Sequence, residues 1–193
     1  MTEILLARHG QTAWNAERRW QGQADVPLDT LGRDQAHDLA HRLAHERLDA
    51  VYSSDLSRAR ETAEAVAAPH GLAVRSLPEL REIDVGSWSG LTTDEIQRRD
   101  PAARERVAER GYGWEGGETP EEMQERAVAA VRRIAGDHPG ARVLVVGHGG
   151  VIRAIQAAAA GVDYAEYRRR VPVVANCEVS RVAVEDGILR PLD

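Results

Sequence analysis

Two histidines follow short apolar runs near opposite ends of the chain, and each stands beside glycine. His9 follows residues 4–7 within Arg8-His9-Gly10, and His148 follows residues 142–146 within Gly147-His148-Gly149-Gly150. An imidazole has an ordinary pKa of about 6.5, so near neutral pH it can act as a nucleophile or transfer a proton. If both apolar runs are parallel strands, their carboxyl ends open into one crevice. The pattern therefore predicts that the two histidines share a site.

Two further segments supply charged side chains to the same predicted crevice. Arg58 follows the apolar run 49–52 and stands in the first turn of an expected helix, and the segment 80–86 holds Glu82 and Asp84. Arginine binds phosphate oxygens bidentately, and helix N-termini add backbone donors. A carboxylic acid can protonate a leaving alcohol oxygen. Together with Arg8, these residues predict a phosphate pocket in which a carboxylic acid of this segment, Glu82 or Asp84, can serve as the proton donor.

The charge of the chain limits its partners. All its basic residues are arginine, which excludes a P-loop lysine, a pyridoxal-phosphate Schiff base and a lysine nucleophile. The net charge of -6 argues against a sequence-independent nucleic-acid binder. It does not exclude an anionic substrate, because an arginine at about 4 Å is worth roughly 4 kcal/mol per charge pair before desolvation. Surface carboxylates beyond about 8–10 Å are screened.

No metal site, membrane span or targeting segment is expected. The single cysteine, Cys177, excludes an internal disulfide and a multi-cysteine zinc site. His37, His41 and His45 have helical spacing, but they fall on a flank that turns toward solvent. No apolar stretch approaches the ~20 residues of a membrane helix, and the N-terminus lacks a signal-peptide core. A cytoplasmic protein without a membrane partner is predicted.

Short apolar runs alternate with longer helical patterns, which indicates a layered α/β fold. We expect a mostly parallel central sheet with helices on both faces, and an antiparallel edge strand where residues 178–184 alternate between apolar and polar. The other strands are expected at 4–7, 49–52, 73–75 and 142–146, and the helices at 31–48, 56–68, 120–136 and 149–161.

The length predicts a single domain, 1–193, with residues 86–118 as a small helical insertion over the active site. This segment is rich in glycine and tryptophan and has a helical pattern from about 92 to 110. Trp88 and Trp114 either shape the substrate side of the pocket or pack the insertion against the sheet. The basic run Arg168-Arg169-Arg170 is either a solvated face or a rim that steers anions.

The sequence motifs also resemble those of a known family. The blocks Arg8-His9-Gly10, Gln21-Gly22, 54–63, 80–86 and 147–150 occur in the order found in the histidine phosphatase superfamily. From Ile4 to about Val182 the chain resembles the phosphoglycerate-mutase-like branch of that superfamily. One such block recurs by chance, whereas several in order are specific.

The resemblance implies a role for each matching residue. His9 is the nucleophile that becomes phosphorylated, and Arg8, Arg58 and His148 hold the phosphate. Glu82 protonates the leaving oxygen and later helps to activate water. No metal or cofactor is implied. The residues implied or expected to contact phosphate or substrate also include Thr12, Asn15, Gln21, Gly22 and Gly149.

Phosphatases and mutases both occur in this branch. Cofactor-dependent mutases of this branch are longer, and residues 84–92 resemble the phosphatase members. We therefore expect metal-independent hydrolysis of a small phosphomonoester, with a small phosphorylated metabolite as the partner. The alternatives are mutase-type transfer between hydroxyls and, less favoured, a non-catalytic phospholigand-binding protein. A homodimer is compatible with the sequence.

Overall fold

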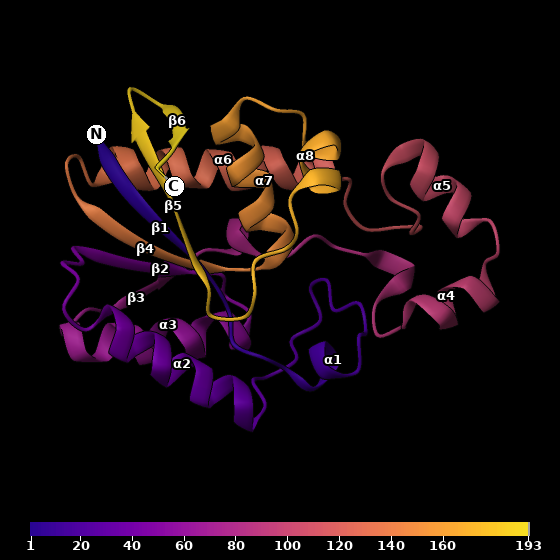
Figure 1. Ribbon diagram of the computed structural model, residues 1–193, viewed down its shortest axis with the longest axis horizontal. Coiled ribbons are helices and arrows are strands. Elements are labelled where there is room, and N and C mark those ends of the chain that lie inside the picture. Colours follow the sequence, from indigo (N-terminus) through magenta and orange to yellow (C-terminus); the bar gives the residue numbers. More distant parts are fainter. Residues whose placement is uncertain (193) are drawn as a thin grey trace.

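Six strands form one sheet in the order β3-β2-β4-β1-β5-β6. The computed structural model describes residues 1–192 (Figure 1). The first four strands are parallel, and β5 and β6 each run antiparallel to the preceding neighbour. This arrangement confirms the predicted mostly parallel α/β sheet. The strands are β1 (Thr2–Arg8), β2 (Ala50–Ser53), β3 (Val74–Ser76), β4 (Arg142–Gly147), β5 (Val179–Glu185) and β6 (Ile188–Pro191).

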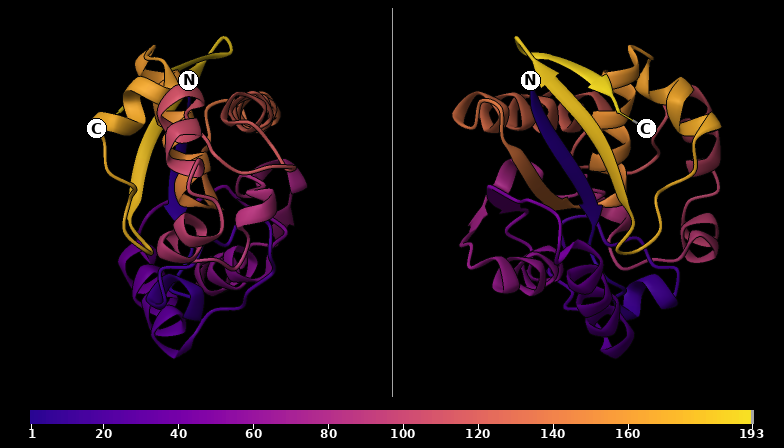
Figure 2. Two further views of the ribbon diagram at one scale, coloured as in Figure 1. Left: turned by 90° about the vertical axis from the view of Figure 1, so that its right-hand side faces the viewer. Right: turned by 60° about the vertical axis from the view of Figure 1, so that its left-hand side comes forward.

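Helices cover both faces of the sheet (Figures 1 and 2). Within residues 1–192, no helix is long and apolar enough to cross a membrane. The α-helices are α1 (Ala13–Ala16), α2 (Thr30–Leu43), α3 (Ser57–His70), α4 (Thr93–Arg99), α5 (Ala103–Arg110), α6 (Pro120–Asp137), α7 (Gly149–Ala160) and α8 (Tyr164–Arg170). Two short 3₁₀ helices are η1 (Pro78–Leu80) and η2 (Gly86–Trp88).

The strands are apolar on both sides, so the sheet separates two cores. Ile4 and Leu6 of β1 belong to the core under α6 and α7, whereas Leu5 and Ala7 belong to the core under α2 and α3. Successive residues of a strand point to opposite faces, which explains this division. Strands buried on both faces read as continuous apolar runs, as β1 and β4 do.

Three elements differ from the sequence prediction. Residues 178–184 were expected at the edge of the sheet, but β6 pairs with the second half of β5 and is itself the edge. The turn at Asp186-Gly187 therefore joins a hairpin. The helical pattern at 92–110 is divided into α4 and α5, because Pro101 disfavours helical backbone at the residue before it, and Asp100 is indeed not helical (φ -143°, ψ 83°). The basic run 168–170 lies in the last turn of α8, a helix that the sequence analysis missed.

The register of the parallel strands determines where the candidate site lies. Arg8 pairs with Gly147, and Ser53 pairs with Val146, so β1, β4 and β2 end at the same level. The residues that follow these ends therefore meet at one edge of the sheet. In Figure 1, α4 and α5 of the predicted insertion lie beyond α1, to the side of the sheet. The prediction of one domain with an insertion at 86–118 stays a prediction.

Candidate active site

His9 follows the end of β1 and is 3% exposed. Its Nδ1 lies 2.6 Å from the carbonyl oxygen of Gly10. A carbonyl oxygen only accepts hydrogen bonds, so in this contact Nδ1 carries the proton and donates it. The lone pair of the neutral ring is then on Nε2. The backbone of the next residue thus fixes both the orientation and the tautomer of His9.

His148 lies beside His9 and is fully buried as the N-cap residue of α7. The two ring centroids are 5.2 Å apart, with 61° between the ring planes. Burial, followed by the positive charge of Arg58, lowers the pKa of both histidines well below 6.5. Both imidazoles are therefore neutral at pH 7. Neither ring nitrogen of His148 has a hydrogen-bond partner within residues 1–192.

Arg58, which is buried, and Arg8, which is partly buried, bring two guanidinium groups to the same place. Arg58 is 1% exposed, and its terminal nitrogens donate to the carbonyls of Ala24 at 2.7 Å and Gly22 at 2.9 Å. Arg8 Nη1 donates to the Val174 carbonyl at 2.9 Å. Neither Nε has a partner among the described residues. Burial lowers both pKa values, that of Arg58 to about 10, so both side chains stay charged near neutral pH.

Glu82 is held against the first turn of α7. Its Oε2 accepts from the backbone N–H of Gly150 at 3.1 Å, and its Oε1 accepts from that of Ile83 at 3.0 Å. A Cβ atom at position 150 would lie 2.5 Å from Oε1, so glycine allows this close approach. Asp84 instead accepts from the N–H of Gly86 at 2.9 Å. Glu82 lines the cavity described below, and Asp84 does not.

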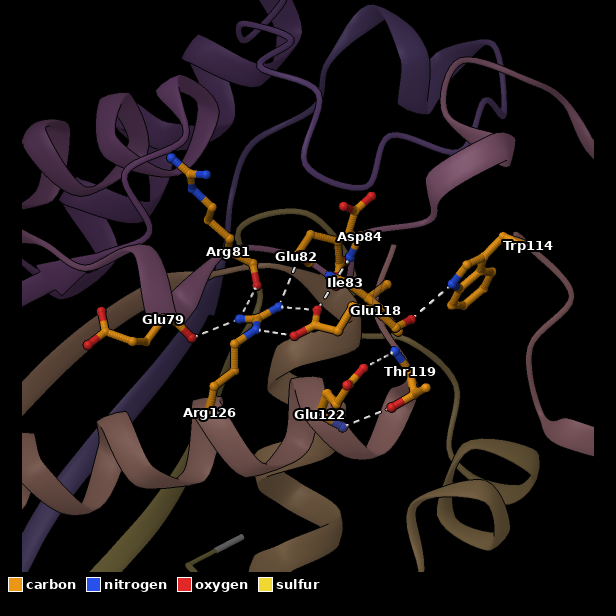
Figure 3. A network of polar contacts seen from close by, with 10 residues as sticks. All are labelled: Glu79, Arg81, Glu82, Ile83, Asp84, Trp114, Glu118, Thr119, Glu122 and Arg126. Carbon is orange, nitrogen blue, oxygen red and sulfur yellow. Dashed lines mark hydrogen bonds and ion pairs between the residues drawn. The ribbon is translucent and has the colours of Figure 1, made fainter. Parts of the chain in front are cut away.

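Arg126 of α6 fixes the backbone that leads to Glu82 (Figure 3). It donates to the carbonyl oxygens of Glu79 at 2.8 Å, Arg81 at 2.7 Å and Glu82 at 3.1 Å. Its other donors reach the Glu118 carboxylate at 2.5 and 2.7 Å. One guanidinium thereby satisfies three carbonyls of a segment that has few backbone partners of its own.

These side chains open onto a cavity of about 560 Å³. Eight of the ten residues predicted for the site line it. They are Arg8, His9, Asn15, Gln21, Gly22, Arg58, Glu82 and Gly149. The other two, Thr12 and His148, are fully buried and are not among the lining residues, although the His148 ring lies beside that of His9.

Thr12 was expected to contact substrate, and the structure gives it a different place. It caps α1, and its Oγ1 lies 3.0 Å from Gln21 Oε1 and 3.2 Å from Asn15 Oδ1. Its hydroxyl is therefore used within the protein, where it orients two residues that do face the cavity. Direct contact between Thr12 and substrate stays a prediction, and the structure adds this positioning contact to it.

The sequence analysis missed a second group of lining residues. They come from α1, the loop after it, α7 and α8, and they include Trp14, Arg18, Trp20, Arg153 and Tyr164. Arg168, from the basic run that the sequence analysis offered as a rim that steers anions, also lines the cavity. Arg153 stands four residues after Gly149, on the same face of its helix, and this spacing was the available signal. Trp114 lines the cavity, whereas Trp88 does not and packs against Trp114 with ring centroids 5.4 Å apart.

Comparison with known sequences decides the family. A family model described as histidine phosphatase superfamily (branch 1) matches residues 4–190. The chain belongs to this superfamily. The family resemblance inferred from the motifs is thereby confirmed, and the match includes every residue predicted for the site.

Relatives in the superfamily include proteins from Arabidopsis thaliana. A metal-independent phosphoserine phosphatase is 42% identical over 174 residues, covering 83% of this chain and 72% of that protein. Phosphoglycerate mutase-like protein 4 is 39% identical over 190 residues, covering 96% of this chain and 80% of that protein. The superfamily and its phosphatase relatives support assigning this chain as a phosphoric monoester hydrolase.

Solved structures of this superfamily share the fold over nearly the whole chain. Bacillus stearothermophilus YhfR matches with a TM-score of 0.92 and 36% identity, covering 100% of this chain and 96% of that one. A mycobacterial glucosyl-3-phosphoglycerate phosphatase, in complex with VO3, matches with a TM-score of 0.88 and 32% identity, covering 97% of this chain and 95% of that one.

Proposed function

We propose that this histidine phosphatase hydrolyses a small phosphomonoester, without a metal ion, through a phosphohistidine on His9. The observation that carries the proposal is the state of His9, a buried neutral imidazole with Nδ1 hydrogen-bonded to the Gly10 carbonyl. Its Nε2 lone pair is available for attack. Arg8 and Arg58, each with an unpartnered buried Nε, offer the donors that a phosphoryl group needs.

In the first step, His9 Nε2 attacks phosphorus and the bond from phosphorus to the alcohol oxygen breaks. The leaving oxygen takes the proton of the Glu82 carboxylic acid, so a neutral alcohol departs. Arg8, Arg58 and His148 hold the equatorial oxygens and stabilise the charge that develops on them. The fixed positive charges of the two arginines do the electrostatic work that a metal ion does in other phosphatases.

In the second step, water attacks the phosphorus of phosphohistidine while the Glu82 carboxylate takes one of its protons. The N–P bond breaks, inorganic phosphate leaves, and His9 Nε2 and the Glu82 acid are restored. The contacts from Ile83 and Gly150 keep the Glu82 carboxylate in place through both steps. A small phosphorylated metabolite fits the cavity of about 560 Å³, and a cytoplasmic location remains part of the proposal.

A mutase is the second candidate, because one of the relatives is named phosphoglycerate mutase-like. The first step would be the same. In the second step, another hydroxyl would replace water and receive the phosphoryl group. Isotopic phosphate from a monophosphoglycerate would then appear in its isomer faster than in solution.

The proposal is tested by p-nitrophenyl phosphate hydrolysis across pH 4–9 with excess EDTA, comparing the wild type with His9→Ala. We expect EDTA-resistant activity in the wild type and none in the variant. Full activity in the variant would exclude His9 as the nucleophile, and loss of activity with EDTA would exclude metal-independent chemistry. An inactive wild type would lead to a bisphosphoglycerate-primed mutase assay.

A further inference from the structure

The cavity carries more positive charge than one phosphate needs. Arg8 and Arg58 adjoin the histidines, and Arg19 is paired with Glu17 and Glu95 at 2.7 Å each. Three other lining arginines make no ion pair with any carboxylate in the described part of the chain. These are Arg18, Arg153 and Arg168. This excess of positive charge is local to the cavity, since the whole chain carries a net charge of -6.

Among these three arginines, Arg153 is distinguished by a buried donor that the described part of the protein leaves unused. Its Nε is buried without a hydrogen-bond partner among residues 1–192, its Nη1 donates a long hydrogen bond of 3.4 Å to the Val171 carbonyl, and its guanidinium also lies beside the Tyr164 hydroxyl. A guanidinium that faces a cavity with unused donors is suited to a planar anion, because its fork matches carboxylate or phosphate oxygens.

Two side chains of α8 stand beside Arg153. Tyr164 is 9% exposed, lines the cavity and has its hydroxyl beside the Arg153 guanidinium. Burial raises the pKa of Tyr164, so this hydroxyl keeps its proton and can donate. Arg168 follows one helical turn later on the same face and donates to the Gly111 carbonyl. The α7–α8 corner therefore gathers two cations and one neutral donor.

We propose that Arg153, Tyr164 and Arg168 form a second anion subsite, which binds a carboxylate or a second phosphate on the alcohol part of the substrate. The proposal rests on the proposed phosphatase function. It places the second anion on the leaving-group side, because Gly150 holds Glu82 and Arg153 stands three residues further along α7, about 4.5 Å along the helix axis. The substrate class is a short phosphomonoester with a second anionic group.

Matched substrates test the subsite. Phosphoserine and phosphoethanolamine differ by the carboxylate, and fructose 1,6-bisphosphate and fructose 6-phosphate differ by the second phosphate. For at least one pair, we expect the wild type to favour the member with the second anion in kcat/KM by roughly ten- to hundredfold. The pair that shows this preference identifies whether the anion is a carboxylate or a phosphate.

Variants assign that preference to residues. Arg153→Met should remove most of the preference, and Arg153→Lys should restore part of it. Arg170→Met is the matched control, because Arg170 pairs with Glu166 at 2.9 Å and lies outside the cavity lining. It should keep the wild-type preference. An Arg153→Met enzyme that keeps the full preference would contradict the assignment of the subsite to Arg153. A wild type that hydrolyses p-nitrophenyl phosphate but discriminates within neither substrate pair would contradict the subsite itself.

Binding to His9→Ala separates the subsite from the catalytic proposal. Calorimetry of this variant with phosphoserine, phosphoethanolamine and the two fructose phosphates measures discrimination without turnover. Discrimination that Arg153→Met removes would support the subsite even if the wild type hydrolysed neither these compounds nor p-nitrophenyl phosphate, in which case the phosphatase proposal alone would fail. Equal affinities within both pairs would overturn the subsite.

Discussion

At the scale of single residues, the site depends on how its environment sets the protonation of each group. Burial keeps His9 neutral, and the Gly10 carbonyl selects the tautomer that leaves Nε2 free. Burial does not discharge Arg58, whose pKa of about 10 is still well above neutral pH. One buried environment therefore holds a neutral imidazole beside a charged guanidinium group.

Glu82→Gln tests the proposed role of Glu82 as the acid that protonates the leaving oxygen. An amide holds the same position but cannot give up a proton in the same way, so alkyl phosphates should be hydrolysed roughly 10²–10⁴-fold more slowly. p-Nitrophenyl phosphate, whose leaving group needs little protonation, should be affected far less. Steady-state kinetics with both esters measures the difference.

Asp84→Asn is the control for that experiment, because the Asp84 carboxylate accepts from the Gly86 N–H and does not face the cavity. It should leave the ratio of the two rates at its wild-type value. Equal slowing of both esters by Glu82→Gln would instead mean that Glu82 only binds substrate.

At the scale of elements, the sequence predicted most of the strands and helices and the cavity-lining residues that follow the strand ends. The apolar runs of β1, β2 and β4 locate the strands, and residues placed after their ends meet for purely geometric reasons. The rest of the cavity lining includes side chains of α7 and α8, such as Arg153 and Arg168. The positions of these two helices relative to the cavity depend on how they pack in the tertiary structure. A single sequence does not show that packing. The short strand β6 was missed because it has only four residues, of which Leu189 alone is buried.

Arg126 is predicted to affect hydrolysis indirectly, by holding the backbone that positions Glu82. Arg126→Met would leave three backbone carbonyls and the Glu118 carboxylate without their partner, so we expect a loss of about 2–3 kcal/mol of stability. Because the backbone at Glu82 would shift, alkyl phosphate hydrolysis should also fall more than p-nitrophenyl phosphate hydrolysis.

Arg133→Met provides the comparison on the same helix. Arg133 is half-exposed, and within residues 1–192 its side chain pairs with the Glu79 carboxylate, at 2.9 Å. Urea unfolding should show a change within about 0.5 kcal/mol, with an unchanged ratio of the two ester rates. If Arg126→Met destabilised the protein but also kept that ratio, Arg126 would be structural only.

At the scale of the whole molecule, the buried histidines connect the site to global stability. The pKa values of His9 and His148 are lowered on folding from about 6.5, so below that pH the unfolded chain binds more protons than the folded one. By linkage, the unfolding free energy is unaffected by these groups above pH 6.5 and falls as the pH drops below it. Each histidine contributes a slope of up to about 1.4 kcal/mol per pH unit.

His148→Asn should therefore reduce the slope of unfolding free energy between pH 6.5 and 5. Urea denaturation at several pH values measures this slope independently of any overall loss of stability. His45→Asn removes an exposed histidine and should keep the wild-type slope. An unchanged slope in His148→Asn would mean that His148 is not held neutral by the fold.

The most direct test of the account is to trap the phosphoenzyme. The wild type is mixed with a phosphomonoester, quenched in alkali during turnover, digested and analysed by mass spectrometry for a phosphoryl group on the peptide that contains residue 9. We predict a phosphoryl group on His9 that is lost on acid treatment and is absent from His9→Ala. Turnover without a phosphorylated histidine, or with the phosphoryl group on another residue, would contradict the mechanism.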